Sequence, residues 1–251
     1  MKKRYAIIDE IRGLIIVSMI IYHGIWSMVY IFGEEWSWYQ SVAAYWWQQS
    51  ICWGFIMLSG FCWSMGKHKW RRGILVFAAG ILVSVVTRLV MPENAITFGV
   101  LTCLGSCMLL MIPLQKLMGF LKPVPGALLS FGLFVLLRNV NRGGLGFEDW
   151  KLMELPESLY ADLATAYLGF PPESFYSVDY FPVLPWLLLF LTGYFIYRML
   201  EEKNCFAVFE KKESGLMQIP LNWLGRHSLF IYLIHQPIIY GGLYLWYTVS
   251  A

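Results

Sequence analysis

The chain of 251 residues is 58% hydrophobic and 18% aromatic but only 14% charged. Its mean hydropathy of +0.57 excludes a soluble globular protein and predicts one integral membrane domain over residues 1–251. The net charge of +3 comes from basic residues that flank apolar segments, which argues against a nucleic-acid partner. The five cysteines are an odd number and four lie inside apolar segments, so neither a disulfide framework nor a metal site is indicated.

The first apolar segment, roughly 11–32, carries ionisable residues on one face of a predicted helix. At about 100° per residue, Asp9, Arg12 and His23 fall within a sector about 60° wide. Because an ionisable group in hydrocarbon costs about 2.5 kcal/mol or more, this sector should face a protein interior or a wet cavity. In a purely structural alternative, Asp9 and Arg12 are an ion pair at the helix entrance and His23 is a hydrogen-bonded core histidine.

Six further apolar segments follow, at roughly 44–66, 73–91, 97–119, 125–140, 182–200 and 221–248. They predict an all-α, polytopic membrane helix bundle of about seven transmembrane helices with one long extracytoplasmic loop. Basic residues, including those at 2–4, 67–72 and 211–212, occupy every second connection, and the connections between them are acidic. The positive-inside rule therefore predicts a cytoplasmic N-terminus and an extracytoplasmic C-terminus.

The long connection, residues 141–181, is the predicted outer loop. A loop of about forty residues is typical of a lid or a binding element rather than of simple linkage. Near its end, Asp179 precedes Pro182 and Pro185, which fix the direction of the chain as it enters the sixth segment. Asp179 is thus expected near the outer mouth, either as a functional carboxylate or as a solvated acid at a helix start.

Small residues line two of the predicted helices. In the fourth segment, Gly99, Cys103 and Cys107 recur at i, i+4 and i+8, and Gly54 and Gly60 belong to a comparable face of the second. Small side chains let two helices approach closely, so both faces are interpreted as packing surfaces.

The last segment carries a polar stripe. Ser228, Tyr232 and His235 recur at i, i+4 and i+7 on an otherwise apolar helix. Arg226 lies at the inner mouth of this helix and, like the arginines at 71–72, suits a phosphate-bearing ligand from the cytoplasm. The positive-inside rule alone would also place these cations there.

Five stretches of the chain, in this order, resemble the catalytic membrane domain of the heparan-alpha-glucosaminide N-acetyltransferase family. They are IDEIRGLIIVSMIIYH, GFIMLSGFCWSMGKHKWRRGI, TFGVLTCLG, LGFPPESFYSVDYFPVLPWLLLFLTGYFIYR and LNWLGRHSLFIYLIHQP. The resemblance runs through nearly the whole chain and is closer still to the bacterial family that is grouped with this domain. The first, second and last stretches are also similar to those of the acyltransferase-3 sugar O-acetyltransferases, which usually have more spans.

This resemblance implies acyl transfer across a bacterial cytoplasmic membrane. The donor would be an acyl-CoA, expected to be acetyl-CoA, bound from the cytoplasmic side, and the acceptor a saccharide amine or hydroxyl on the other side. Arg12 matches the family's arginine, and His23 matches a position that is histidine in the O-acetyltransferases and asparagine in the animal enzyme. Two histidines of the family are missing: the first outer loop has none, and Thr102 occupies the histidine position of the bacterial FGxLH motif.

The chemistry of acyl transfer assigns roles to these residues. Transfer from a thioester needs a base for the acceptor's proton, and a histidine, with a reference pKa of about 6.5, can serve at neutral pH. His23 is the first candidate for this base and His235 the second, with Asp179 orienting the base or the acceptor. Four cations are candidates for holding the CoA phosphates, namely Arg12, Arg71, Arg72 and Arg226.

Two other classes of function stay open. The same buried charges would suit a small-solute transporter or exporter, although the halves of the sequence show no internal repeat and no paired broken helices. A catalytically inert membrane assembly partner is the other class, because Thr102 replaces the FGxLH histidine. Both a monomer and a homo-oligomer fit the sequence.

Overall fold

The structure is a computed structural model that describes residues 5–209 and 218–250, and this part of the chain is mostly helical. The chain divides into two compact units, Met1–Phe55 with Asn204–Ala251, and Ile56–Lys203. The single membrane domain over residues 1–251 stays a prediction. The basic residues at 2–4 and 211–212, on which the predicted topology partly rests, lie outside the described residues.

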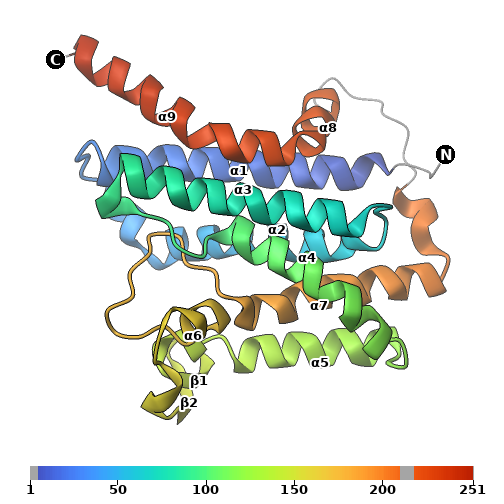
Figure 1. Cartoon of the computed structure of the whole chain (residues 1–251). Helices are drawn as coiled ribbons and strands as arrows, with labels where there is room; N and C mark the ends of the chain where they lie inside the picture. Colours follow the sequence, from blue (N-terminus) through green and yellow to red (C-terminus); the bar gives the residue numbers. More distant parts are fainter. Residues whose placement is uncertain (1–4, 210–217, 251) are drawn as a thin grey trace. The chain divides into compact units, whose positions relative to one another are not determined.

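The first unit is helical, and α1 packs against both C-terminal helices, α8 and α9 (Figure 1). α2 continues across the unit boundary after Phe55. The elements of the first unit are α1 (Ala6–Tyr30), the 3-10 helix η1 (Ser37–Gln40), the first part of α2 (Val42–Trp63), η5 (Cys205–Phe209), α8 (Gln218–Arg226) and α9 (Ser228–Ser250).

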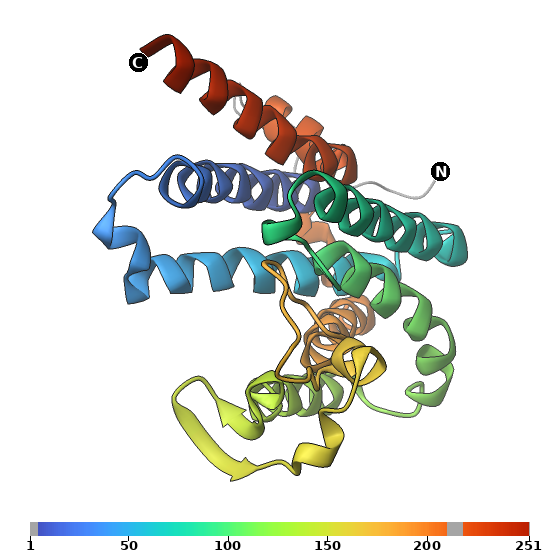
Figure 2. The same cartoon turned by 60° about the vertical axis from the view of Figure 1, so that its left-hand side comes forward.

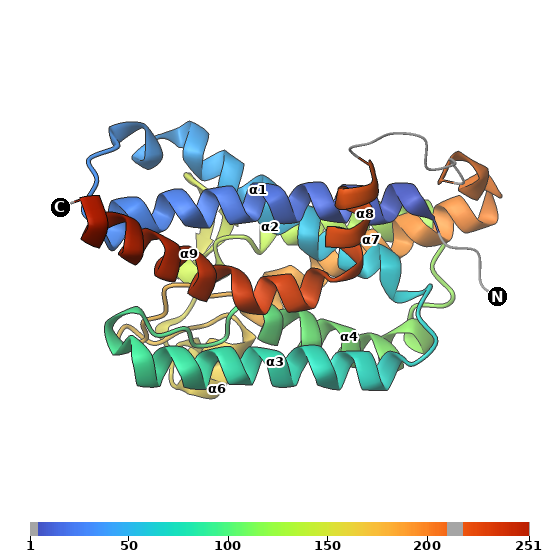
Figure 3. The same ribbon diagram turned by 90° about the horizontal axis from the view of Figure 1, so that it is seen from above.

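The last apolar segment, predicted as one span at roughly 221–248, contains most of α8 and of α9. α9 is the candidate membrane span, so one span is found there but it starts at Ser228 and not at about 221. α8 and α9 are separated by His227, whose N–H donates to the carbonyl oxygens of both Trp223 and Leu224, as at a helix end. The chain turns there, and α9 then runs along α1 (Figure 3).

Glycines bring α8 and α1 into backbone contact. A Cβ added to Gly13 would overlap the Leu221 carbonyl oxygen, and one added to Gly225 would overlap the Asp9 carbonyl oxygen. Because the later residue of α8 meets the earlier residue of α1, the two helices are antiparallel. This tight contact holds α8 along the N-terminal half of α1.

α9 instead runs parallel to α1. His235 contacts His23, and Tyr247, twelve residues further on, donates a hydrogen bond of 2.6 Å to Glu34 beyond the end of α1. The C-terminal ends of α1 and α9 therefore lie at the same end of this unit.

The second unit contains the remaining helices and a hairpin. α3 packs along α4, and α5 along α7, with the hairpin at the end of α5 (Figures 1 and 2). In the hairpin, β1 and β2 are antiparallel, with Gly144 opposite Glu154. The elements are the rest of α2, α3 (Lys69–Val90), η2 (Pro92–Asn94), α4 (Val100–Leu117), α5 (Pro123–Leu136), η3 (Val140–Arg142), β1 (Gly144–Phe147), β2 (Trp150–Glu154), η4 (Glu157–Leu159), α6 (Leu163–Leu168) and α7 (Val183–Glu202).

Five helices of the described part are long and apolar enough to cross a membrane: α1, α3, α4, α7 and α9. The predicted segment 125–140 corresponds to α5, which has 14 residues. A helix needs about 20 residues to span a bilayer. The segment 44–66 corresponds to α2, which has 22 residues but is made less apolar by its tryptophans and its two glutamines. The structure thus confirms an integral membrane protein but not the count of seven spans.

The long connection 141–181 is partly folded, and its β-hairpin corrects the prediction of an all-α chain. It contains the hairpin and α6, whose first turn is capped by Asp162: its Oδ1 accepts the N–H groups of Ala164 and Thr165 at 2.8 and 2.9 Å. Cross-strand hydrogen bonds and this cap satisfy backbone groups that a plain loop would leave to water.

Within the second unit, α2 and α7 approach each other through one glycine on each helix. A Cβ at Gly60 would overlap the Phe190 carbonyl oxygen, and a Cβ at Gly193 would overlap the Met57 carbonyl oxygen. The packing interpretation of the small face of α2 is therefore confirmed at Gly60.

Gly193→Ala is expected to lower the free energy of unfolding by about 1–3 kcal/mol, because the added methyl group must push two backbones apart. Gly132→Ala on α5 is the matched control, since nothing in the described structure lies within 4 Å of its Cβ. The control should be neutral or stabilising by up to about 1 kcal/mol. Thermal unfolding in detergent measures both, and equal melting temperatures for the two variants would contradict the close contact.

Candidate active site

The N-terminal end of α1 forms an ion cluster with the end of α8. Asp9 is only 6% exposed, and its carboxylate lies between two guanidinium groups. Arg12 Nη1 is 3.4 Å from Oδ1, and Arg226 Nε is 3.6 Å from Oδ2. Arg12 also donates to the Gly225 carbonyl oxygen at 3.3 Å. Two of the four predicted phosphate-binding arginines thus meet at one carboxylate, which leaves these three side chains with a net charge of +1.

Further along α1, two predicted histidines are in contact. The ring centroids of His23 and His235 are 5.0 Å apart, with an interplanar angle of 64°. The face of α1 that carries Asp9 and Arg12 beside α8 therefore carries His23 beside α9. The predicted sharing of one face is confirmed.

The geometry of His235 defines its tautomer. Its Nδ1 lies 2.5 Å from the Tyr232 carbonyl oxygen. A carbonyl oxygen only accepts, so in the neutral ring Nδ1 carries the hydrogen and Nε2 carries the lone pair. His235 is 7% exposed, and its Nε2 has no hydrogen-bond partner within residues 5–209 and 218–250. A buried imidazole nitrogen with an unused lone pair is suited to accept a proton.

Asp179 belongs to the second unit, where it caps a helix other than the one expected. Its Oδ2 accepts the N–H of Val100, the first residue of α4, at 3.3 Å. The backbone just after Asp179 also contacts the residues that precede α4, since the Phe181 N–H donates to the Phe98 carbonyl oxygen at 2.8 Å. Burial raises the pKa of Asp179 from 3.8 to about 6, and the hydrogen bond from Val100 partly opposes that rise. A role of Asp179 beside the histidines stays a prediction.

The raised pKa of Asp179 makes the stability of the fold pH-dependent. The folded chain holds this proton between pH values of about 4 and about 6, where the unfolded chain has released it, so stability should fall as the pH rises through that window. Asp179→Asn keeps an oxygen acceptor but does not titrate. We therefore expect the melting temperature of the natural protein, relative to that of Asp179→Asn, to decrease between about pH 4 and about pH 6. An unchanged difference across this range would mean that Asp179 has an ordinary pKa.

The other two predicted cations, Arg71 and Arg72, lie in the first turn of α3. Arg71 is exposed, and the guanidinium of Arg72 lies against the backbone of Gly66. Both belong to the second unit, so a joint phosphate site with Arg12 and Arg226 stays a prediction.

Thr102, at the position of the family's FGxLH histidine, is a packing residue. It is 2% exposed, and a Cβ added to Gly80 of α3 would lie 2.5 Å from both the nitrogen and Oγ1 of Thr102. The side chain therefore faces a tight contact between α3 and α4, where a larger imidazole would not fit without separating the two helices.

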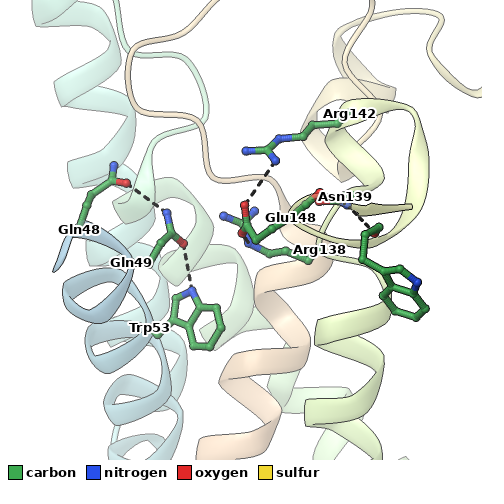
Figure 4. Close-up of polar contacts among 8 residues, drawn as sticks. Gln48, Gln49, Trp53, Arg138, Asn139, Arg142 and Glu148 are labelled. Atoms are coloured by element: carbon green, nitrogen blue, oxygen red, sulfur yellow. Dashed lines mark hydrogen bonds and ion pairs between the residues drawn. The ribbon is translucent and has the colours of Figure 1, made fainter. Parts of the chain in front are cut away.

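A buried arginine beyond α5 was missed by the sequence analysis. The side chain of Arg138 is 9% exposed and lies 3.5 Å from Glu148, which also pairs with Arg142 at 3.4 Å (Figure 4). Arg138 also stacks on Trp186, and Asn139 donates to the Glu148 carbonyl oxygen at 2.8 Å. The sequence feature that could have identified it is an arginine inside the predicted apolar span 125–140. These contacts attach the hairpin turn to the end of α5, which indicates a structural role.

Comparison with known protein families gives a match over most of the chain. Residues 4–237 match the protein family described as heparan-alpha-glucosaminide N-acetyltransferase, catalytic. No curated protein and no solved structure matches the chain. Because the match spans nearly the whole chain, including α1 and the histidine on α9, the protein belongs to the heparan-alpha-glucosaminide N-acetyltransferase catalytic-domain family of membrane acetyltransferases.

Proposed function

We propose that this protein transfers an acetyl group from cytoplasmic acetyl-CoA to the amine or hydroxyl of a saccharide on the opposite side of a bacterial cytoplasmic membrane. The observation that carries the proposal is the pair of histidine rings, 5.0 Å apart, between α1 and α9, two candidate membrane-spanning helices. The family of acetyltransferases to which the chain belongs supplies the reaction type.

His235 is the base in this proposal, and His23 orients the acceptor. The sequence ranks His23 first, but the hydrogen bond at Nδ1 supports a lone pair on Nε2 of His235. The equivalent of His23 in the resembling animal enzyme is asparagine, which can hold an acceptor by hydrogen bonds but cannot take its proton at neutral pH.

A single base is enough for the proposed reaction, because the proton that it takes from the acceptor is the one that the departing sulfur needs. The acceptor nitrogen or oxygen attacks the thioester carbonyl carbon as His235 removes its proton. The C–S bond breaks, a new C–N or C–O bond remains, and the departing sulfur takes up the proton from His235. General-base help of this kind is worth about a hundredfold or more.

The cluster of Asp9, Arg12 and Arg226 fits the donor's phosphates. Guanidinium groups bind phosphates through charge-assisted hydrogen bonds, and the Asp9 carboxylate holds both of these groups in place before a ligand arrives. Arg71 and Arg72 are the second proposed cationic element for the same donor.

The proposed orientation puts the N-terminus in the cytoplasm and the C-terminus outside. It is supported by the basic connections and by the parallel directions of α1 and α9, because two parallel spans begin on the same side of a membrane. The ion cluster then lies at the cytoplasmic end of α1, and the histidines lie deeper.

Sealed proteoliposomes test the proposed function. An oligosaccharide with one free amine is trapped inside, and acetyl-labelled acetyl-CoA is added outside. An acetyltransferase should transfer label to the trapped saccharide. Export of unlabelled saccharide would instead indicate a transporter, and neither label nor export in vesicles of verified orientation would indicate an inert assembly partner.

A further inference from the structure

A polar groove in the second unit has no role in the proposed reaction. It has a volume of about 450 Å³ and lies between the end of α3 and the folded long connection. The residues that matter for its chemistry are Arg88, Thr97, Asp162, Ser174, Phe175 and Tyr176.

Arg88 is the cation of this groove. It is exposed, and its Nη2 donates to Thr97 Oγ1 at 3.3 Å. No carboxylate within the described ranges forms an ion pair with it. Asp162 also lines the groove, but its Oδ1 is occupied by two backbone N–H groups of α6. The guanidinium therefore keeps donors available for an anion.

The helix that carries Arg88 presents an apolar surface along its length. α3 has the highest hydropathy of the five candidate spans, and only 17% of its most apolar window is buried. Arg88 follows Ile81 by seven residues, about two helical turns, so both side chains lie on the same face. The exposed apolar side chains of this part of α3 are Ile74, Leu75, Ile81, Leu82, Val85, Val86, Leu89 and Val90.

We propose that this groove binds the phosphate of a membrane glycerophospholipid, whose acyl chains lie along the exposed face of α3. A guanidinium at the end of a lipid-facing helix is at the depth of phosphate groups and binds them through charge-assisted hydrogen bonds. The Thr97 hydroxyl holds the guanidinium toward the groove. Tyr176, 68% exposed, provides the amphipathic ring typical of the membrane–water interface.

Native mass spectrometry of the full chain in detergent tests this site with added phosphatidylglycerol. Arg88→Gln should weaken the tightest phosphatidylglycerol adduct about tenfold or more, because it removes a charged hydrogen-bond donor. Arg88→Lys should retain part of the binding. The matched control is Arg142→Gln, another exposed arginine of the same unit whose guanidinium already pairs with Glu148. The control should bind phosphatidylglycerol like the natural protein.

Two further measurements locate the lipid. Diacylglycerol, which lacks the phosphate, should bind at least tenfold more weakly than phosphatidylglycerol. A photoreactive side chain at position 176 should capture phosphatidylglycerol in the natural background but not together with Arg88→Gln. Equal binding of the two lipids would show that only the apolar face is used, and unchanged binding or capture with Arg88→Gln would also overturn the proposal. The thermal unfolding of each variant checks its folding.

Discussion

His235→Ala is expected to lower the rate of acetyl transfer per folded molecule by about a hundredfold or more, with little change in donor binding. The reason is that the substitution removes the proposed proton acceptor, Nε2, whereas the Asp9 cluster keeps its contacts. Single-turnover transfer of label, measured at saturating acetyl-CoA, reports the chemical step directly. His68→Ala, at an exposed histidine before α3, should retain full activity.

The two histidines are separated by His23→Asn. If His23 orients the acceptor, His23→Asn should retain most of the rate and mainly raise the KM for the saccharide. His23→Ala should then lower the rate and also raise the KM. If His23 is the base, as the sequence ranked it, His23→Asn should lose about a hundredfold while His235→Ala loses less. If both histidines serve only in packing, activity should follow the amount of folded protein in every variant.

Asp9→Asn should cost about 2 kcal/mol of stability, the largest effect expected for a polar substitution in the first unit. The carboxylate pairs with two guanidinium groups, and an amide removes the negative charge from both of these pairs. The value lies below that of a fully buried pair because the side chains of Arg12 and Arg226 are 21% and 38% exposed. Thermal unfolding in detergent measures the loss.

Glu10→Gln is the matched control for Asp9→Asn. It makes the same chemical change one residue further along α1, at a carboxylate that forms no ion pair in the described part of the chain. The melting temperature of Glu10→Gln should stay close to that of the natural protein. If Asp9→Asn proves equally mild, the carboxylate does not hold α8 against α1.

The sequence alone determined the properties that depend on neighbouring residues. Hydropathy over about twenty residues is enough to predict a membrane-spanning helix, and it located α1, α3, α4, α7 and α9. Helical periodicity relates residues within one helix, so it placed Asp9, Arg12 and His23 on one face, and the i,i+3 ion pair of Asp9 with Arg12 followed from the same spacing. The family motifs, which are also local strings, led to the family that residues 4–237 match.

Only the tertiary structure decided which distant residues meet. Asp9 lies beside Arg226, His23 beside His235, and the Asp179 carboxylate at the first residue of α4, and no local pattern encodes these pairs. The packing of α8 is likewise a tertiary property: its contacts at Gly13 and Gly225 place it against α1, and neither contact can be read from the sequence of the segment 221–248. Buried Arg138 follows the same rule: the cost of burying its charge is offset by Glu148, a partner that periodicity cannot identify because it lies beyond the helix.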